Sequence, residues 1–421
     1  GLIAALDVGG AKAACVIAKP DADGGLAVLG SGARACRGVR GGAIVDLDAA
    51  ESAIVDAVAA AESEAGVEIE TVVASVCAGR LTSQMIAVEI PLSDRRVEDE
   101  DVRCALEAGC DAEDVPGPAQ GRELIHTIPV AFSVDDARGV RDPRGMFGDL
   151  LGVNLHVVTA QANAVRTLAG CLERARLDVE MMCAPPIAAG LGALVDDEME
   201  LGGLVVDLGH GVTSMAVFFD GQPVWCDGVP IGGGHVTNDL ARGLSVPVAE
   251  AERLKTLHAS AQGAASDDAE LVRAEALGGA EGGEAERRIA RSEITRIVEP
   301  RIEEIFDLVR LKLKETGFDE VAGRSAVLTG GGADLHGVRE FAARALGKET
   351  RVGRPLSRPQ PGGRGALRGA SDALAGPEWT VPIGLLRYAA LHREAGDAPG
   401  RAGGRNRGVF GRIGQWLKEN F

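Results

Sequence analysis

Two short loops of acidic and small residues are candidates for phosphate chemistry. The first reads Leu6-Asp-Val-Gly-Gly-Ala-Lys12 and the second Val206-Asp-Leu-Gly-His-Gly-Val-Thr213. In each, an apolar strand ends in aspartate, a glycine follows after one residue, and a second apolar strand begins. Glycine lets backbone N–H groups approach phosphate oxygens, and a strand-end carboxylate can hold Mg²⁺ through water. One such hairpin is more often a plain turn, but two of them, about 200 residues apart, predict two similar domains that grip one phosphorylated ligand.

Each loop residue has an expected role in binding that ligand. We expect the loops to present N–H groups, and one ammonium group, to the β- and γ-phosphates through Gly9, Gly10, Ala11, Lys12, Gly209, His210, Gly211 and Val212. Asp7 and Asp207 are the candidate metal-side carboxylates, and Asp207 is the candidate catalytic residue that orients an attacking water. A tight structural hairpin, or a capping role for either aspartate, is the alternative.

Further glycine turns predict the rest of the ligand site. Gly330, Gly331 and Gly332 follow an apolar strand and open a helix at about Asp334, an arrangement that suits the adenosine or α-phosphate side of a nucleotide. A second turn with Gly233 and Gly234 also enters a helix. Downstream, Glu252 and Lys255 share a helix face and could bond a ribose and an adenine edge. A strand–helix turn and a surface ion pair remain the alternatives.

Composition limits the classes of protein that this chain can be. It has 421 residues, 46% of them apolar, which predicts two to four domains with sizeable cores. A net charge of −18 and an aromatic content of 3% argue against a nucleic-acid binder, since neither a basic field nor stacking platforms are present. We therefore expect no nucleic-acid partner.

Cysteine, histidine and apolar runs give the expected compartment. The eight cysteines are scattered without a Cys-x-x-Cys pair, and the seven histidines are equally dispersed. This pattern is typical of reduced core residues in a cytosolic protein without a zinc site. No apolar run approaches the ~18–20 residues of a spanning helix, and no signal peptide is visible. The chain starts at Gly1 without Met, and we expect a short native N-terminus to precede it.

The predicted elements divide the chain into several parts. Strands at 2–8, 13–18 and 26–31, a helix at 48–65 and a strand at 71–77 form a β-β-β-α-β series. This series resembles half of a ribonuclease-H-like domain.

The pattern then changes between residues 79 and 156. Strands at 85–90 and 124–134 and a helix at 97–108 predict a small inserted α+β subdomain. Pro129 interrupts the second strand and places it towards a sheet edge.

The second half begins with the hairpin after residue 204. We expect 259–286 to form a polar loop, 287–315 a helix that Pro300 divides or restarts, and 382–392 the last helix. Residues 393–408 are typical of a flexible linker.

The last thirteen residues predict a membrane-binding helix. Six apolar residues fall on one helical face of 409–421, and basic residues flank them: the apolar residues are Val409, Phe410, Ile413, Trp416, Leu417 and Phe421. A basic amphipathic helix with Trp and Phe suits the interface of an anionic membrane, where it lies rather than spans. A C-terminal helix docked on its own core, or a partner-binding peptide, is the alternative.

Together these motifs resemble the actin, Hsp70 and sugar-kinase superfamily and, within it, the bacterial actin-like division proteins of the FtsA family. The resemblance rests on sequence motifs that include the two aspartate loops, Ile231 to Ala241, Ala251 to Lys255 and Val327 to Gly337. Inside the insert, His126-Thr-Ile-Pro and Asp142-Pro-Arg-Gly-Met match family phrases.

The resemblance implies an α/β, actin-like fold of two ribonuclease-H-like domains around a nucleotide cleft, with an inserted subdomain and a C-terminal amphipathic helix. The implied parts are a first core domain, the insert, a second core domain, its outer lobe, a linker and the membrane helix: 1–78 with 157–190, 79–156, 191–234 with 322–392, 235–321, 393–408 and 409–421.

The resemblance also implies a function. Such a protein binds ATP and Mg²⁺, forms filaments with itself, and anchors the FtsZ ring to the cytoplasmic face of the cell membrane at the division site, where later division proteins join. The FtsZ C-terminal tail would bind the outer lobe, where Arg296 and Arg301 are candidate contacts for an acidic peptide. A solvated helix face is the alternative for both arginines.

Three departures from the family pattern affect the expected activity. His210 and Val212 stand in a stretch that is usually Gly-Gly-Gly-Thr, and Ser214 replaces a frequent Asp. The segment 183–189 lacks the polar residue that actin uses near its attacking water, so ATP hydrolysis should be slow at most. A small-molecule kinase or a pilus-assembly ATPase-like adaptor of the same superfamily remains the alternative function. An Hsp70-type chaperone would need a further domain, for which the C-terminal residues leave no room.

Overall fold

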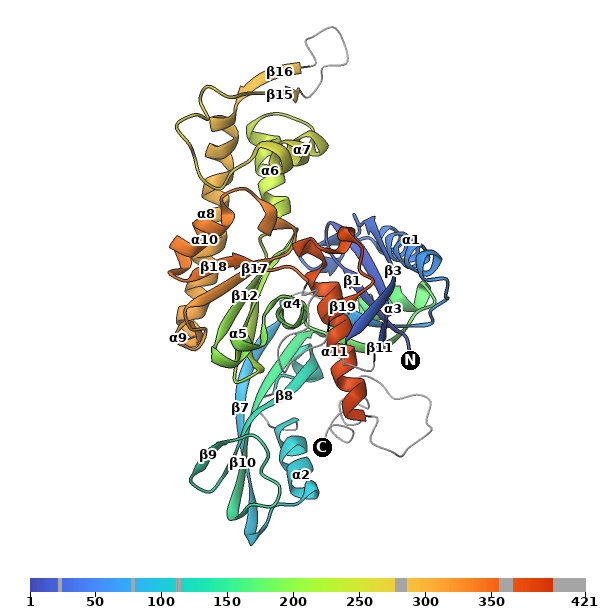
Figure 1. Ribbon diagram of the computed structural model, residues 1–421, viewed down its shortest axis with the longest axis vertical. Coiled ribbons are helices and arrows are strands. Elements are labelled where there is room, and N and C mark those ends of the chain that lie inside the picture. The colour runs from blue at the N-terminus through green and yellow to red at the C-terminus, as the bar shows by residue number, and fades with distance from the viewer. Residues whose placement is uncertain are drawn as a thin grey trace.

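The computed structural model describes residues 1–396 apart from 22–24, 77–79, 111, 113–114, 277–285 and 356–365. Two domains, each built on a β-sheet, lie side by side in the middle of an elongated molecule (Figure 1). A helical lobe forms one end and a strand-rich subdomain forms the other. The predicted membrane helix 409–421 lies outside the described residues.

The first domain contains a six-stranded sheet in the order β11-β6-β1-β2-β3-β19. β1, β2 and β3 form an antiparallel meander, while β6 and β11 join parallel to it. The strands are β1 (Ile3–Val8), β2 (Lys12–Pro20), β3 (Leu26–Ala35), β6 (Thr71–Ser75), β11 (Asp178–Cys183) and β19 (Leu367–Arg368).

Two helices, α1 (Leu47–Ala65) and α3 (Ala162–Arg174), cover one face of this sheet. α1 begins where the Asp46 side chain accepts a hydrogen bond from the Ala49 N–H, and ends at Gly66 in the left-handed conformation. Its buried stripe consists largely of alanine. The helix lies so close to β3 that a Cβ on Gly30 would stand 2.2 Å from the Ala61 carbonyl oxygen.

The second domain repeats the same strand pattern. Its five-stranded sheet has the order β14-β13-β12-β17-β18, with β12, β13 and β14 antiparallel and β17 and β18 parallel. The strands are β12 (Gly203–Leu208), β13 (Thr213–Phe219), β14 (Gln222–Val229), β17 (Ser325–Thr329) and β18 (Glu349–Val352).

The two sheets share one apolar core through α4 (Pro185–Ala193) and α11 (Thr380–Gly396). These helices cross very closely, since a Cβ on Gly384 would fall 1.7 Å from the Ala188 carbonyl oxygen. Gly190 likewise leaves room for the fully buried Phe218 ring of the second sheet. α11 continues to Gly396, four residues beyond the helix end expected from sequence, so the predicted linker begins with helical residues.

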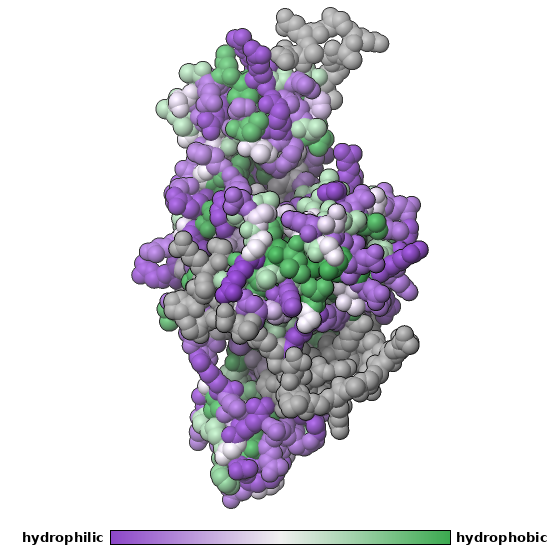
Figure 2. Space-filling model, turned by 45° about the vertical axis from the view of Figure 1, so that its right-hand side comes forward, coloured by the Kyte–Doolittle hydropathy of each residue, from purple (hydrophilic) through white to green (hydrophobic). Residues whose placement is uncertain are grey.

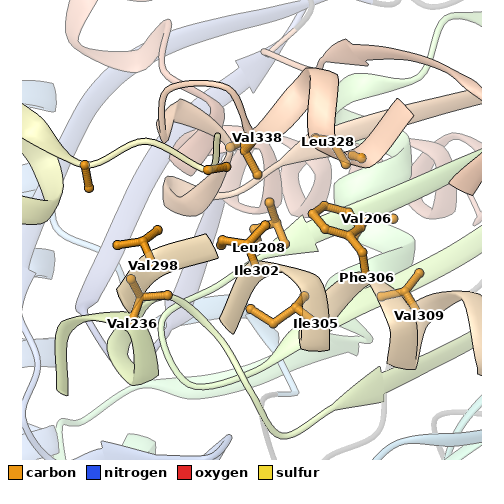
Figure 3. Close-up of a cluster of buried hydrophobic side chains, with 14 of the residues drawn as sticks. Val206, Leu208, Val236, Val298, Ile302, Ile305, Phe306, Val309, Leu328 and Val338 are labelled. Atoms are coloured by element: carbon orange, nitrogen blue, oxygen red, sulfur yellow. The ribbon is translucent and has the colours of Figure 1, made fainter. Parts of the chain in front are cut away.

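The far face of the second sheet is covered by α8 (Arg291–Thr316) and α10 (Val338–Leu346). Figure 3 shows Phe306 of α8 in the cluster with Val206 of β12, Leu328 of β17 and Val338 of α10. The expectation that Pro300 divides this helix is wrong, because α8 runs through it without a break. Its buried apolar stripe, which spans Ile294 to Leu313, stabilises the helix on both sides of the proline.

The helical lobe at one end carries α6 (Gly233–Gly243), α7 (Val248–His258) and a hairpin of β15 (Leu271–Glu275) and β16 (Glu286–Ala290). The sequence assigned 259–286 to a loop and 287–315 to the long helix, and it missed both strands of the hairpin. β15 lies inside the expected loop, and β16 takes the expected start of the helix, which begins at Arg291. The hairpin forms because Val272, Ala274 and Ile289 are buried together against the lobe.

The strand-rich subdomain is a four-stranded sheet in the order β7-β10-β8-β9, with α2 packed on it. Pro129 lies at a register shift in β8, beyond the reach of the short β9, so one side of the strand is locally unpaired there. The elements are β7 (Thr82–Arg96), α2 (Asp99–Cys110), β8 (Arg122–Val134), β9 (Ala137–Val140) and β10 (Phe147–Gln161).

This subdomain contacts the second domain as well as the first. Its Ser83 hydroxyl donates to the Cys226 carbonyl at 2.8 Å and accepts from the Cys226 N–H at 3.0 Å. The His156 Nδ1 lies 2.8 Å from the Pro223 carbonyl oxygen. Both contacts reach β14, so the subdomain is fixed to the edge of the second sheet.

The remaining short elements connect these layers. They are β4 (Val39–Arg40), β5 (Ala43–Ile44), α5 (Asp196–Leu201), α9 (Phe318–Val321) and the 3-10 turns η1 (Pro118–Gln120), η2 (Gly331–Asp334), η3 (Asp372–Leu374) and η4 (Pro377–Trp379). The helix expected at Asp334 is therefore only a 3-10 turn, and α10 begins at Val338. The face in Figure 2 is mostly hydrophilic, with apolar side chains gathered near the middle of the molecule. Among the described helices, none is long and apolar enough to cross a membrane.

Candidate functional site

A cleft of about 460 Å³ lies between the two domains, and the predicted loops line it. Its walls come from both sheets, from α6 and α7 of the lobe, and from η4 before α11. The predicted residues in its lining are Asp7, Gly9, Gly10, Ala11, Lys12, Asp207, Gly209, His210, Gly211, Val212, Gly233, Glu252, Lys255, Gly330, Gly331 and Gly332. Gly234, also predicted, is not in the lining.

The first loop is the tight turn between β1 and β2. The Gly9 N–H donates to the Lys12 carbonyl at 2.9 Å, which closes the hairpin. Asp7 lies in β1 and accepts a 2.6 Å hydrogen bond from the Ser75 hydroxyl, which in turn accepts from the Val8 N–H. Ser75 ends β6, the parallel neighbour of β1, so it anchors Asp7 from the next strand.

The second loop is the matching turn between β12 and β13, and it is joined to the start of α6. The Gly209 N–H donates to the Val212 carbonyl at 3.1 Å. The N–H groups of Gly233 and Gly234 donate to the Gly209 and His210 carbonyls at 2.9 and 2.7 Å. These two N–H groups are therefore already used within the protein, as are those of Gly9 and Gly209, which close their own hairpins.

His210 fills space between the two domains. A Cβ on Gly234 would lie 2.4 Å from its Nε2 atom, and a Cβ on Gly10 of the first loop would lie 3.4 Å from its Cδ2 atom. Burial lowers the pKa of His210 from its ordinary value, and the charge of Lys255 lowers it further. The ring therefore packs as a neutral group between the first loop and the start of α6.

Asp7 and Asp207 are half-buried carboxyl groups that face the cleft. Burial raises the pKa of Asp7, against the opposing effects of Ser75 and Lys12. Burial, followed by the nearby charge of Asp7, raises the pKa of Asp207 to about 7. The two carboxylates therefore repel each other across the cleft and favour a cation between them.

Ser214 lies opposite Asp207 in the β12–β13 ladder and also lines the cleft. Its hydroxyl is close enough to lower the pKa of Asp207 slightly, yet it is buried without a hydrogen-bond partner of normal geometry. A buried hydroxyl without a partner costs free energy, so this site suits a hydrated ligand. Among the described residues, no group of three or more metal-binding side chains exists. The two carboxyl groups that face the cleft, Asp7 and Asp207, are oxygen ligands of the kind that Mg²⁺ takes while it keeps most of its waters.

The third glycine loop lies directly against Asp207. Gly330 has φ +78°, and a Cβ there would stand 2.2 Å from the Asp207 Oδ1 atom. The Gly330 N–H donates to the Pro377 carbonyl at 3.2 Å. Only glycine meets both requirements, a left-handed backbone and close approach to the carboxylate.

Glu252 and Lys255 form a wall of the cleft from α7. The Lys255 ammonium donates to Glu252 at 2.7 Å, to the Thr237 hydroxyl at 2.9 Å and to the Gly233 carbonyl at 3.2 Å. Thr237 also donates to Glu252 at 2.5 Å. This network joins α7 to α6 and holds both charged groups at the cleft surface.

Sequence reasoning missed Ser75, Thr237 and Glu378. Glu378 belongs to η4 and lines the cleft, and its negative charge raises the pKa of Lys12. The position of Ser75 at the end of a strand parallel to β1 was a usable signal, because such strand ends meet at one sheet edge. Thr237 and Glu378 carried no local signal.

The two arginines predicted for a peptide partner lie on α8, outside the cleft lining. Arg301 Nε donates to Asp239 at 2.6 Å, and its guanidinium also pairs with Glu304. Arg296 is exposed, and its Nε donates to the Ser292 carbonyl at 3.2 Å. Arg301 is therefore partly neutralised by its neighbours, whereas Arg296 faces solvent.

The fold and the cleft define an actin-like α/β protein. One chain of the PilM-PilN type IV pilus biogenesis complex aligns with TM-score 0.63 at 18% identity, covering 92% of this chain and 98% of that one. MreB5 of Spiroplasma citri, solved bound to ADP, aligns with TM-score 0.55 at 14% identity, covering 93% and 98%. At these identities the likeness shows the fold alone.

Sequence comparison identifies the family. The cell division protein FtsA of Rhizobium meliloti is 39% identical over 100% of this chain and 95% of its own, and that of Escherichia coli K12 is 27% identical over 99% and 96%. The family model for the cell division protein FtsA matches residues 204–384, and that for the SHS2 domain inserted in FTSA matches 78–159. The chain belongs to the FtsA family of actin-like cell division proteins. The kinase and pilus-adaptor alternatives are set aside by this assignment.

Proposed function

We propose that this division protein binds Mg·ATP in the interdomain cleft and tethers FtsZ filaments to the cytoplasmic face of the membrane. The observation that carries the proposal is the convergence of three glycine turns on two half-buried carboxyl groups, Asp7 and Asp207, in one cleft. FtsA family membership supplies the division context.

In this proposal the two hairpin loops hold the β- and γ-phosphates. Lys12 contributes the positive charge from the first domain, and Gly330 to Gly332 with Glu252 and Lys255 receive the adenosine. Asp7 and Asp207 hold the water shell of Mg²⁺, which would neutralise phosphate charge. Pro185 forms the cleft wall where the chain crosses between domains. Because the described residues of the crossing segment 183–189 include no carboxylate or histidine to act as a general base, nucleotide turnover would be slow.

Nucleotide occupancy would favour closure of the two domains and thereby the contacts between successive subunits of a filament. The first and second loops already approach each other, since a Cβ on Gly10 would lie 3.8 Å from the Gly211 nitrogen. We assign one face of the longitudinal contact to the inserted subdomain, which projects from the end of the molecule (Figure 1).

Membrane attachment is assigned to residues 409–421. The chain carries a net charge of −18, so the body itself is repelled by an anionic surface. The tail instead combines Trp416 and five other apolar residues with Arg412 and Lys418. Basic residues near anionic lipid contribute about 1 kcal/mol each. One short helix of this kind binds reversibly, and a filament of many subunits would bind firmly through avidity.

The FtsZ C-terminal tail is the proposed occupant of the lobe, with Arg296 and Arg301 as contacts. Arg296 is free to pair with an acidic peptide, while Arg301 would exchange its contact with Asp239. Replacement of both by alanine should abolish peptide binding. Arg310→Ala is the matched control, because Arg310 also lies on α8 and pairs with Asp307 at 2.8 Å. Equal peptide binding by all variants would remove the arginines from the proposal.

Co-sedimentation with anionic liposomes tests the tether. The full chain should pellet with liposomes, more strongly with Mg·ATP, and should carry an FtsZ tail peptide with it. Deletion of 409–421 should abolish pelleting and leave nucleotide binding unchanged. A full chain that stays in the supernatant, or a truncated chain that pellets equally, would contradict the membrane assignment.

A further inference from the structure

Lys12 has an unusual environment at the phosphate end of the cleft. Its Nζ atom lies 4.0 Å from the centroid of the Trp379 ring, within the range of a cation–π interaction. Among the described residues, no hydrogen bond or ion pair reaches this ammonium. Burial lowers the pKa of Lys12, while the charges of Glu378 and Asp7 raise it. The ring face is therefore its direct partner in the absence of ligand.

The ring lies behind the lysine as seen from the cleft. Lys12 and Glu378 both line the cleft, whereas Trp379 does not and is 7% exposed within the core shared by the two sheets. A ring in this position supports the ammonium against the cleft wall without occupying ligand space.

The turn that carries Trp379 is rigid. The Pro377 carbonyl accepts hydrogen bonds from the Thr329 hydroxyl at 2.9 Å, the Thr380 hydroxyl at 2.7 Å and the Gly330 N–H at 3.2 Å. The third glycine loop, η4 and the start of α11 are thus tied at one atom. A free lysine has four flexible side-chain bonds, so a fixed aromatic face restricts an otherwise mobile charge.

We propose that Trp379 is a positioning residue for nucleotide binding, which holds the Lys12 ammonium ready for the β- and γ-phosphates. This inference rests on the proposed nucleotide site. It assigns Trp379 an effect that acts only through Lys12 and only on nucleotides that carry phosphates beyond the α-phosphate.

A double-mutant cycle tests this assignment in the full chain. Titration calorimetry with ATP, ADP and AMP would compare the unmodified protein with Trp379→Leu, Lys12→Met and the double variant. Trp379→Leu should weaken ATP and ADP about fivefold, which corresponds to about 1 kcal/mol, and leave AMP within about twofold. In the Lys12→Met background, Trp379→Leu should have no further effect on ATP.

Trp379→Phe is the second variant, which keeps the test valid if Trp379→Leu fails to fold. Phenylalanine keeps the apolar packing but offers a weaker cation–π face, so it should show a smaller loss with the same phosphate dependence. Equal losses for ATP and AMP, or a loss that persists in the Lys12→Met background, would show a packing role only and overturn the inference. If the unmodified chain binds no nucleotide, the proposed function fails instead.

Discussion

Replacement of Asp207 by asparagine should stabilise the nucleotide-free protein at alkaline pH while weakening its binding of Mg·ATP. Desolvation of this half-buried carboxyl group and the nearby charge of Asp7 raise its pKa to about 7. A carboxylate that is desolvated beside a second negative charge lowers the free energy of unfolding when it is ionised. Asparagine has a similar shape without the charge, so it removes this cost.

The sign follows from proton binding in the two states. The ordinary pKa of the group is 3.8, so the folded chain binds the proton more tightly than the unfolded chain does. The resulting stabilisation is fully present below pH 3.8, is lost as pH rises from there to about 7, and stays lost above it. Because each tenfold change in proton affinity corresponds to about 1.4 kcal/mol, the whole loss is on the order of 4 kcal/mol at most.

Urea unfolding at pH 5 and pH 8, with chelator and without nucleotide, measures this difference. The stability advantage of Asp207→Asn over the unmodified chain should grow by about 2 kcal/mol between the two pH values. Asp56→Asn, at an exposed position on α1, should show no such growth. Calorimetry at pH 8 should show a weaker response of ATP binding to Mg²⁺ in Asp207→Asn. An advantage that is absent, or that shrinks towards pH 8, would refute the assignment of a half-buried charged Asp207.

Three further changes have definite expected results. Phe306→Ala should lower the unfolding free energy by about 3–5 kcal/mol, because the ring is fully buried in the second domain's core. Gly234→Ala should weaken nucleotide binding, since its Cβ would meet the His210 ring, and His210→Gly should rescue it. In the native protein, Cys104 should react with a thiol reagent faster than the buried cysteines, because it is exposed.

Matched comparisons make these expectations testable. Leu311 lies on the same helix as Phe306 but is 49% exposed, so Leu311→Ala should cost less than about 1 kcal/mol in urea unfolding. If the double variant Gly234→Ala with His210→Gly binds nucleotide no better than Gly234→Ala alone, the added Cβ does not clash with the imidazole. Labelling that proceeds equally fast at buried cysteines would contradict the described core.

Local sequence signals were sufficient for the two phosphate-type hairpins and for most of the helices. Each hairpin needs only two apolar strands and a glycine turn, and α1 needs only its cap, its alanine stripe and its terminal glycine. These features depend on neighbours along the chain, which the sequence displays directly. The family resemblance added the expectation of a shared cleft, and that expectation brought Asp7 and Asp207 into one hypothesis before any contact was visible.

Other features depended on contacts between distant segments. The β15–β16 hairpin and the unbroken α8 arose from burial in the lobe and against the second sheet, which outweighed polar composition and Pro300. The approach of Gly330 to Asp207 and of Trp379 to Lys12 likewise had no local signal. The sequence alone determined the residue types and turns of the site. Only the packing of two sheets around α4 and α11 decided which side chains meet, because buried contacts form where apolar surfaces fit together rather than where residues adjoin in sequence.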